Sequence, residues 1–135
     1  MAIREMVNST RHFIATIHNT KPMLIKDKSG EMFKVRDIDQ LGFPDVLVTC
    51  KLDRRCIGVE VKGKKTRVLP SQIRFREWWE ASGQKYIIAR EPNHMAAVLK
   101  ALLDHCREFG YRDPVALTLL QQFDPIGWKR GDYVR

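Results

Sequence analysis

The chain has 135 residues, enough for one domain with a hydrophobic core and too few for two domains of ordinary size. Its 24 lysine and arginine residues outnumber 16 aspartate and glutamate residues, which gives a net charge of +8. No apolar run approaches the length of a membrane span, and the first residues lack the core of a signal peptide. These features argue against a transmembrane or secreted protein. We expect a cytoplasmic protein with no membrane partner.

The first third of the chain predicts one helix and one hairpin. Apolar residues from Ile3 to Ile17 follow a helical period, which predicts a single amphipathic helix. The apolar segments Met23–Ile25 and Met32–Val35 then flank residues 27–30, whose composition is typical of a tight turn.

A second hairpin is predicted from two apolar, β-branched runs, Val46–Thr49 and Ile57–Val61, which are joined by polar residues. If its turn centres on Asp53, Cys50 faces Cys56 and position 46 faces position 60.

Three charged residues converge on this second hairpin. Asp45 starts the first strand beside Glu60, and Lys62 shares a face with Glu60 because side chains alternate along a strand. Two carboxylates a few ångströms apart repel each other unless a cation neutralises them. The cation preferred by such oxygen ligands is Mg²⁺ or Mn²⁺. The pattern predicts metal-dependent phosphodiester hydrolysis, in which Lys62 orients or deprotonates water or stabilises developing negative charge.

The helix predicted after this hairpin carries a glutamine on its apolar face. Gln72, Phe75 and Trp79 recur at spacings that place them on one side of a helix. A buried amide without a partner costs about 1–3 kcal/mol, so Gln72 needs a polar contact. Glu60 or Lys62 is the predicted partner. The alternative is a glutamine that only caps its own helix terminus.

The remaining elements complete an α/β fold. Tyr86–Ala89 predicts a strand, Asn93 is a candidate cap for a long helix, and residues 113–123 predict a short final helix. The expected fold is a mixed β-sheet flanked by α-helices, in the order α-β-β-β-β-α-β-α plus a short C-terminal helix. We expect a single domain over residues 1–123 and a basic tail over residues 124–135.

Basic residues gather around the predicted site. Residues 51–76 contain nine basic and two acidic residues, a net charge of +7. Such a patch is the electrostatic footprint of a polyanion-binding protein. The residues expected to bind DNA are Lys64, Lys65, Arg67 and Arg74.

The cysteines and histidines predict no further site. Three cysteines form no Cys-x-x-Cys pair and show no Cys/His spacing typical of zinc, and we expect them to remain thiols. A surface position is expected for each of the four histidines, His12, His18, His94 and His105.

Several of these residues together resemble a known nuclease family. The segments Gly42-Phe43-Pro44-Asp45 and Glu60-Val61-Lys62-Gly63, followed by Gln72 and by Gly83 before the strand at Tyr86, are similar to the VRR-NUC (virus-type replication–repair nuclease) family of the PD-(D/E)XK nuclease superfamily. The resemblance covers roughly residues 40–90. It implies a restriction-endonuclease-like fold, a divalent metal, and cleavage of DNA that is often branched.

The resemblance also assigns roles to individual residues. It implies that Asp45, Glu60 and the backbone carbonyl of Val61 bind the metal, that Lys62 is the catalytic lysine, and that Gln72 supports the active site. Relatives often carry one more acidic ligand on the first helix. That position stays open between Glu5, Glu31, Asp37 and Asp39.

The expected function is a divalent-metal-dependent endonuclease acting on branched or four-way-junction DNA in replication, repair or recombination. Since no dedicated recognition domain is evident, we favour structure-specific over sequence-specific cleavage. The alternatives are a non-cleaving DNA-binding module on a nuclease-like scaffold and a restriction-type endonuclease. Small stand-alone domains of this kind look like bacterial or phage enzymes.

We also expect a homodimer. Symmetric incision of a four-way junction needs two active sites, and one domain supplies one. The final predicted helix moreover carries more large apolar residues than the core of so small a domain needs, namely Leu117, Leu119, Leu120 and Phe123.

Overall fold

The fold is a mixed α/β architecture. The computed structural model describes residues 2–18, 23–26, 28–35 and 42–131, and leaves the side chains of residues 23–26 and 32–35 undescribed. This part of the chain contains α1 Ile3–Asn8, β1 Phe13–Ile17, β2 Met23–Lys26, β3 Met32–Val35, β4 Val46–Cys50, β5 Cys56–Lys62, α2 Pro70–Ala81, β6 Lys85–Arg90, α3 His94–Phe109, α4 Pro114–Phe123 and α5 Pro125–Arg130.

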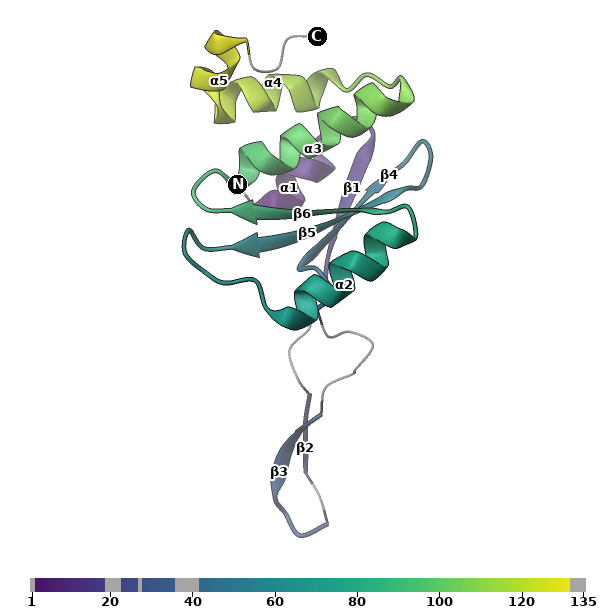
Figure 1. The fold of residues 1–135 in the computed structure, drawn as a ribbon, viewed down its shortest axis with the longest axis vertical. Coiled ribbons are helices and arrows are strands. Elements are labelled where there is room, and N and C mark those ends of the chain that lie inside the picture. The colour runs from purple at the N-terminus through teal and green to yellow at the C-terminus, as the bar shows by residue number, and fades with distance from the viewer. Residues whose placement is uncertain (1, 19–22, 27, 36–41, 132–135) are drawn as a thin grey trace.

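Four strands form an open mixed sheet in the order β1-β4-β5-β6 (Figure 1). The pairs β1–β4 and β4–β5 are antiparallel, whereas β5 and β6 are parallel and are connected through α2, as parallel neighbours require. Strands β2 and β3 form a separate antiparallel hairpin, which confirms the first predicted hairpin. The prediction of a mixed sheet flanked by helices is likewise confirmed.

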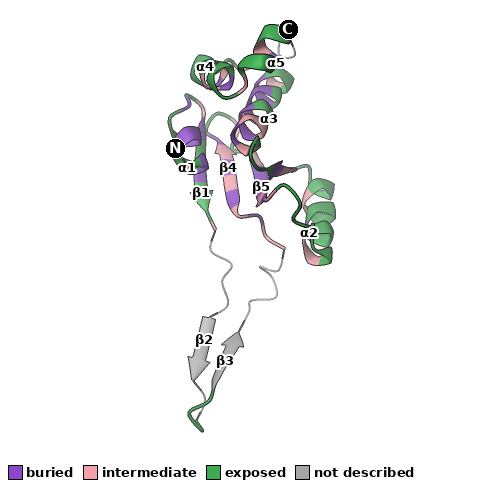
Figure 2. Cartoon of the chain, turned by 90° about the vertical axis from the view of Figure 1, so that its left-hand side faces the viewer, coloured by how far each residue is buried: buried purple, intermediate pink, exposed green. Residues whose placement is uncertain are grey.

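The two faces of the four-stranded sheet are covered differently. Helices α1 and α3 pack over one face and form the main apolar core with it, α4 packs on the outer side of α3, and α2 lies over the other face (Figure 1). Figure 2 shows the contrast, since α2 is largely exposed on its outer side and α3 has a buried inner side. The α2 face carries the polar strand residues Glu60 and Lys62, both of which are buried.

The predicted first helix, Ile3 to Ile17, is wrong beyond Asn8. Helix α1 ends there, and the hydroxyls of Ser9 and Thr10 donate to the carbonyl oxygens of its last turn at 2.6 and 2.5 Å. Such local side-chain bonds compete with continued helix. Residues Phe13–Ile17 instead form β1, because the strand pairs along its whole length with β4.

The register of the second hairpin differs by one residue from the predicted one. Val46 pairs with Val59, and Thr49 rather than Cys50 pairs with Cys56. Paired residues point to the same face of a sheet, so the observed register sends Val46 into the core and brings Asp45 level with Glu60. The predicted pairing of positions 46 and 60 is thus wrong. The expected proximity of Asp45 and Glu60 follows from the observed register instead.

The C-terminal part is more helical than expected. Helices α3 and α4 begin and end close to the predicted positions, and the Asp113 side chain caps α4 by accepting from the Ala116 amide at 3.1 Å. Within the predicted basic tail, residues Pro125–Arg130 form α5. Its first turn is capped by Asp124, which accepts from the Gly127 amide at 3.0 Å.

Helix α4 uses most of its apolar residues in the core. Leu120 is fully buried, and Leu117 and Leu119 pack against the core cluster. These three leucines therefore serve the core and give no support to a dimer, and of the four apolar residues only Phe123 is exposed, at 40%. No helix in the described part of the chain combines the length and apolarity that a bilayer crossing requires.

Candidate metal and nucleic-acid site

Four of the predicted site residues meet on the α2 face of the sheet. Gln72 Nε2 donates to Glu60 Oε1 at 2.8 Å, and Lys62 Nζ lies 3.7 Å from the same oxygen. Asp45 Oδ2 accepts from the backbone amide of Val61, between Glu60 and Lys62, at 3.0 Å. The structure therefore brings the Asp45, Glu60, Lys62 and Gln72 side chains into one cluster.

The chain before β4 is held against the start of α2. Gly42 has φ +83°, and a Cβ on this residue would lie only 2.3 Å from the backbone oxygen of Ser71. Glycine is the residue that permits both this conformation and this close approach. The contact fixes the residues that precede Asp45 against the helical turn that carries Gln72.

Gln72 makes the predicted contact with Glu60 and also caps its own helix, so the alternative of a glutamine that only caps is wrong. Its Oε1 accepts from the backbone amide of Leu69 at 2.9 Å, which caps the first turn of α2. Its Nε2 donates to Glu60, which is the predicted contact with the site. The two bonds use the two ends of one amide, so capping fixes the orientation that presents the donor to Glu60.

Glu60 is a buried carboxylate whose ionised form is destabilised by its surroundings. Its exposed fraction is 4%, and its Oε2 has no hydrogen-bond partner within the described residues. Burial, and after it the charge of Asp45, raise the pKa of Glu60 from 4.5 to about 7 against the opposing effect of the Lys62 ammonium. A carboxylate in this state is stabilised by any additional cation that reaches its free oxygen.

Tyr86 belongs to the same cluster although sequence reasoning did not single it out as a site residue. It is 4% exposed, and its hydroxyl is buried without a partner in the described part of the chain. Burial raises its pKa, and the nearby charges of Glu60 and Asp45 raise it further. Gly58 on β5 makes room for the ring, since a Cβ there would lie 3.2 Å from Tyr86 Cδ2. Tyr86 pairs with Gly58, two residues before Glu60 on β5, so both side chains point to the same face of the sheet. Knowledge of this strand pairing would have identified Tyr86 as a site residue.

His18 is a second residue that sequence reasoning missed. Its amide donates to the carbonyl oxygen of Asp45 at 2.9 Å, which extends the β1–β4 pairing to the site. The ring lies 4.3 Å from the Phe43 ring, and its Nε2 is buried without a partner among the described residues. The prediction of a plain surface position is wrong for this imidazole nitrogen. Nothing in the local sequence indicates this, because the contact depends on strand pairing.

Lys64, Lys65 and Arg67 lie on the segment that joins β5 to α2, and Arg74 lies on α2 itself. Arg90 Nη1 donates to the carbonyl oxygens of Gly63 and Thr66 at 3.1 and 2.7 Å, which ties this segment to the end of β6. The four residues predicted to bind DNA are all exposed, namely Lys64, Lys65, Arg67 and Arg74. No ion pair neutralises them within the part of the chain that the structure describes.

Of the remaining candidates for an acidic ligand, the two that the structure describes are not brought to the cluster. Glu5 is exposed on α1, which packs against β1 and α3 on the opposite side of the sheet from α2. Glu31 is exposed beside the β2–β3 turn, and Asp37 and Asp39 lie outside the described residues. Among the described residues, the cluster therefore offers two carboxylates, Asp45 and Glu60, together with the backbone beside Val61.

The donor set fits a hard divalent cation. The cluster supplies carboxylate oxygens, no sulfur, and the buried Glu60 Oε2 and Tyr86 hydroxyl, which lack partners in the described chain. Oxygen ligands of this kind suit Mg²⁺ or Mn²⁺.

Comparison of the chain with protein-family models, with characterised proteins and with solved structures finds no match.

Proposed function

We propose that the protein is a divalent-metal-dependent endonuclease that hydrolyses phosphodiester bonds in DNA, with a restriction-endonuclease-like arrangement of β4, β5, α2 and β6. The observation that carries this proposal is the convergence of four side chains: Gln72 donates to Glu60, Lys62 forms an ion pair with Glu60, and Asp45 accepts from the amide between Glu60 and Lys62. A structural ion pair alone would not require a second carboxylate beside a buried, incompletely bonded one.

Each side chain has a role that follows from its position. Asp45 and Glu60 would hold the cation, which when bound would supply positive charge at the attacked phosphate and make water more acidic. Gln72 holds the Glu60 carboxylate in one orientation through its 2.8 Å bond. Lys62, 8% exposed and fixed beside Glu60, orients water or stabilises the negative charge that develops on the phosphate.

The adjoining basic segment supports nucleic acid as the substrate. Lys64, Lys65 and Arg67 follow Lys62 directly along the chain and are exposed, so a phosphate backbone lying on them passes the carboxylate cluster. Contacts to phosphates position DNA without reading its sequence. We therefore favour branched or otherwise structured DNA as the substrate.

The test is cleavage of labelled single-stranded, duplex, flap and four-way-junction DNA with Mg²⁺, Mn²⁺ or EDTA. We expect metal-dependent cutting that is lost in Asp45→Asn, and a preferred substrate among the four. Tight binding of the wild type without cutting under any metal would instead identify a non-cleaving DNA-binding module. A strict dependence on base sequence in duplex DNA would favour a restriction-type endonuclease.

Substitution of the basic segment should weaken DNA binding at every sequence. Lys64→Ala and Arg67→Ala each remove an exposed cation, so each should reduce the slope of log affinity against log salt concentration by about 1. Fluorescence anisotropy with labelled duplex across a salt series measures this slope. Glu77→Ala, an exposed acidic position on α2, is the matched control and should not reduce it. An unchanged slope in both Lys64→Ala and Arg67→Ala would show that DNA binds to a surface other than this basic segment.

The homodimer remains a prediction that rests on the need for two incisions in a four-way junction. We expect sedimentation velocity at micromolar concentration to show a species of twice the 15.8 kDa chain mass. A purely monomeric protein under these conditions would contradict the dimer and would favour flaps or single nicks over symmetric junction cleavage.

A further inference from the structure

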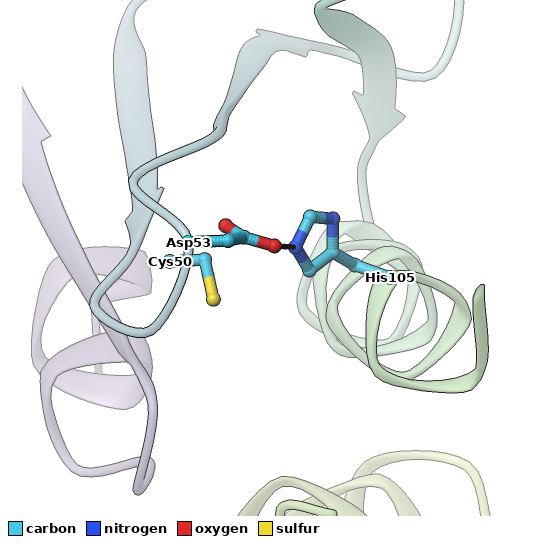
Figure 3. Close-up of side chains that lie close together, drawn as sticks. All are labelled: Cys50, Asp53 and His105. Atoms are coloured by element: carbon cyan, nitrogen blue, oxygen red, sulfur yellow. Dashed lines mark hydrogen bonds and ion pairs between the residues drawn. The ribbon is translucent and has the colours of Figure 1, made fainter. Parts of the chain in front are cut away.

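A second cluster of potential metal ligands lies at the turn end of the β4–β5 hairpin, on the other face of the sheet (Figure 3). Cys50 is the last residue of β4, Asp53 lies in the turn, and His105 reaches toward them from α3. Their ligand atoms all lie within 4.8 Å of one another, and His105 Nε2 is 2.8 Å from Asp53 Oδ2.

Burial distinguishes this cluster from a chance surface grouping. Cys50 and His105 are each 1% exposed, whereas the Asp53 side chain is 15% exposed and forms the solvent side. Cys50 pairs with Phe13 across the sheet, which turns it toward the core and α3 and away from the α2 face that carries Glu60. The two clusters are therefore separate sites with different donor atoms.

We propose that Cys50, Asp53 and His105 bind a Zn²⁺ ion that fastens the hairpin turn to α3. One thiolate, one imidazole and one carboxylate form a donor set that suits Zn²⁺ and not Mg²⁺. Tetrahedral zinc places such ligand atoms ~3.3–3.6 Å apart, so the side chains need to move by about 1 Å or less. Water on the exposed side of Asp53 completes the coordination.

Two features limit the affinity of this zinc site. Binding through Nε2 leaves the imidazole proton on Nδ1, which is buried without an acceptor in the described part of the chain. Loss of such a second hydrogen bond typically costs 10–100-fold in metal affinity. The positively charged Arg55 guanidinium also lies 3.9 Å from the centroid of the Phe109 ring, which itself lies 4.7 Å from the His105 ring. We therefore expect affinity below that of zinc sites with four protein ligands.

The test uses Co²⁺ as a spectroscopic probe and Zn²⁺ as the competitor. Co²⁺ added to the metal-free full chain should produce a thiolate-to-cobalt charge-transfer band that saturates at one equivalent, and one equivalent of Zn²⁺ should abolish it. Cys50→Ser should remove the band and lower Zn²⁺ affinity at least tenfold, and Asp53→Asn should lower it as well. Cys56→Ser, the neighbouring half-buried cysteine, is the matched control and should keep both.

Retention of the band in Cys50→Ser, or its absence in the folded wild type, would overturn the proposal. The cluster would then be a hydrogen-bonded junction between Asp53 and His105 only. Circular dichroism of each variant establishes that it is folded. Asp45→Asn should leave the cobalt spectrum unchanged, because the carboxylates on the α2 face supply no thiolate. The zinc result is thus independent of whether the protein cleaves DNA.

Discussion

Substitution of Lys62 should abolish DNA cleavage while leaving DNA binding nearly intact. The ammonium is buried, lies 3.7 Å from Glu60 Oε1, and is fixed within reach of any group bound to that carboxylate. Removing a group that transfers or orients a proton in the transition state typically costs 10²–10⁴-fold in rate. Lys62→Ala and Lys62→Met should both lose activity to this extent in single-turnover cleavage with excess enzyme. The methionine variant preserves the packing volume of the side chain.

The matched control for this prediction is Lys64→Ala, two residues further along the chain and exposed. It should weaken DNA binding but retain nearly full cleavage at saturating enzyme, because Lys64 makes no contact with Glu60. Full single-turnover activity in Lys62→Met would remove the lysine from the mechanism. Equal loss of binding and cleavage in both variants would show that Lys62 serves only to attract DNA.

Glu60→Gln should eliminate cleavage and at the same time stabilise the metal-free protein at alkaline pH. The folded-state pKa of Glu60 is raised to about 7 from the ordinary 4.5, first by burial and then by Asp45. Between these values the folded protein holds a proton that the unfolded chain releases, so the free energy of unfolding falls as pH rises. The loss amounts to about 3 kcal/mol by the time pH exceeds 7. A glutamine carries no such penalty and can still accept from Gln72.

Urea unfolding in EDTA at pH 5 and pH 8 measures this effect. The wild type should be less stable at pH 8, whereas Glu60→Gln should lose less stability and should be the more stable protein there. Glu80→Gln is the control, because Glu80 is an exposed partner of Arg76 at 2.6 Å and should not alter the pH profile in this way. Parallel pH profiles for Glu60→Gln and the wild type would contradict the raised pKa.

The effect of a divalent cation on stability connects the raised pKa of Glu60 to the proposed function. Mg²⁺ should raise the unfolding midpoint of the wild type at pH 8, where Glu60 is ionised, and much less at pH 5. It should have little effect on Glu60→Gln at either pH. Stabilisation of the variant as large as that of the wild type would place the cation away from Glu60.

The sequence by itself determined those helices and strands that follow from the composition and spacing of neighbouring residues. The polar turn between two β-branched runs predicted the β4–β5 hairpin, and the spacing of Gln72, Phe75 and Trp79 predicted which face of α2 is buried. It also predicted the contact of Gln72 with Glu60, because a buried amide must find a polar partner. These inferences need only periodicity and the cost of unpaired polar groups.

Only the tertiary structure decided the strand β1, the hairpin register and the membership of Tyr86 in the site. The apolar spacing of Phe13–Ile17 is compatible with a helix, and pairing with β4 selects the strand. A register shift of one residue is invisible in composition but decides whether Asp45 or Val46 shares the face of Glu60.

The cluster of Cys50, Asp53 and His105 shows the same limit most clearly. His105 lies 52 residues from Asp53 in the sequence, without the close Cys/His spacing of a familiar zinc motif. The sequence supplied the chemical groups, and packing of α3 against the sheet brought them within 4.8 Å. Long-range proximity is set by how whole elements pack, which the local pattern around each residue does not encode.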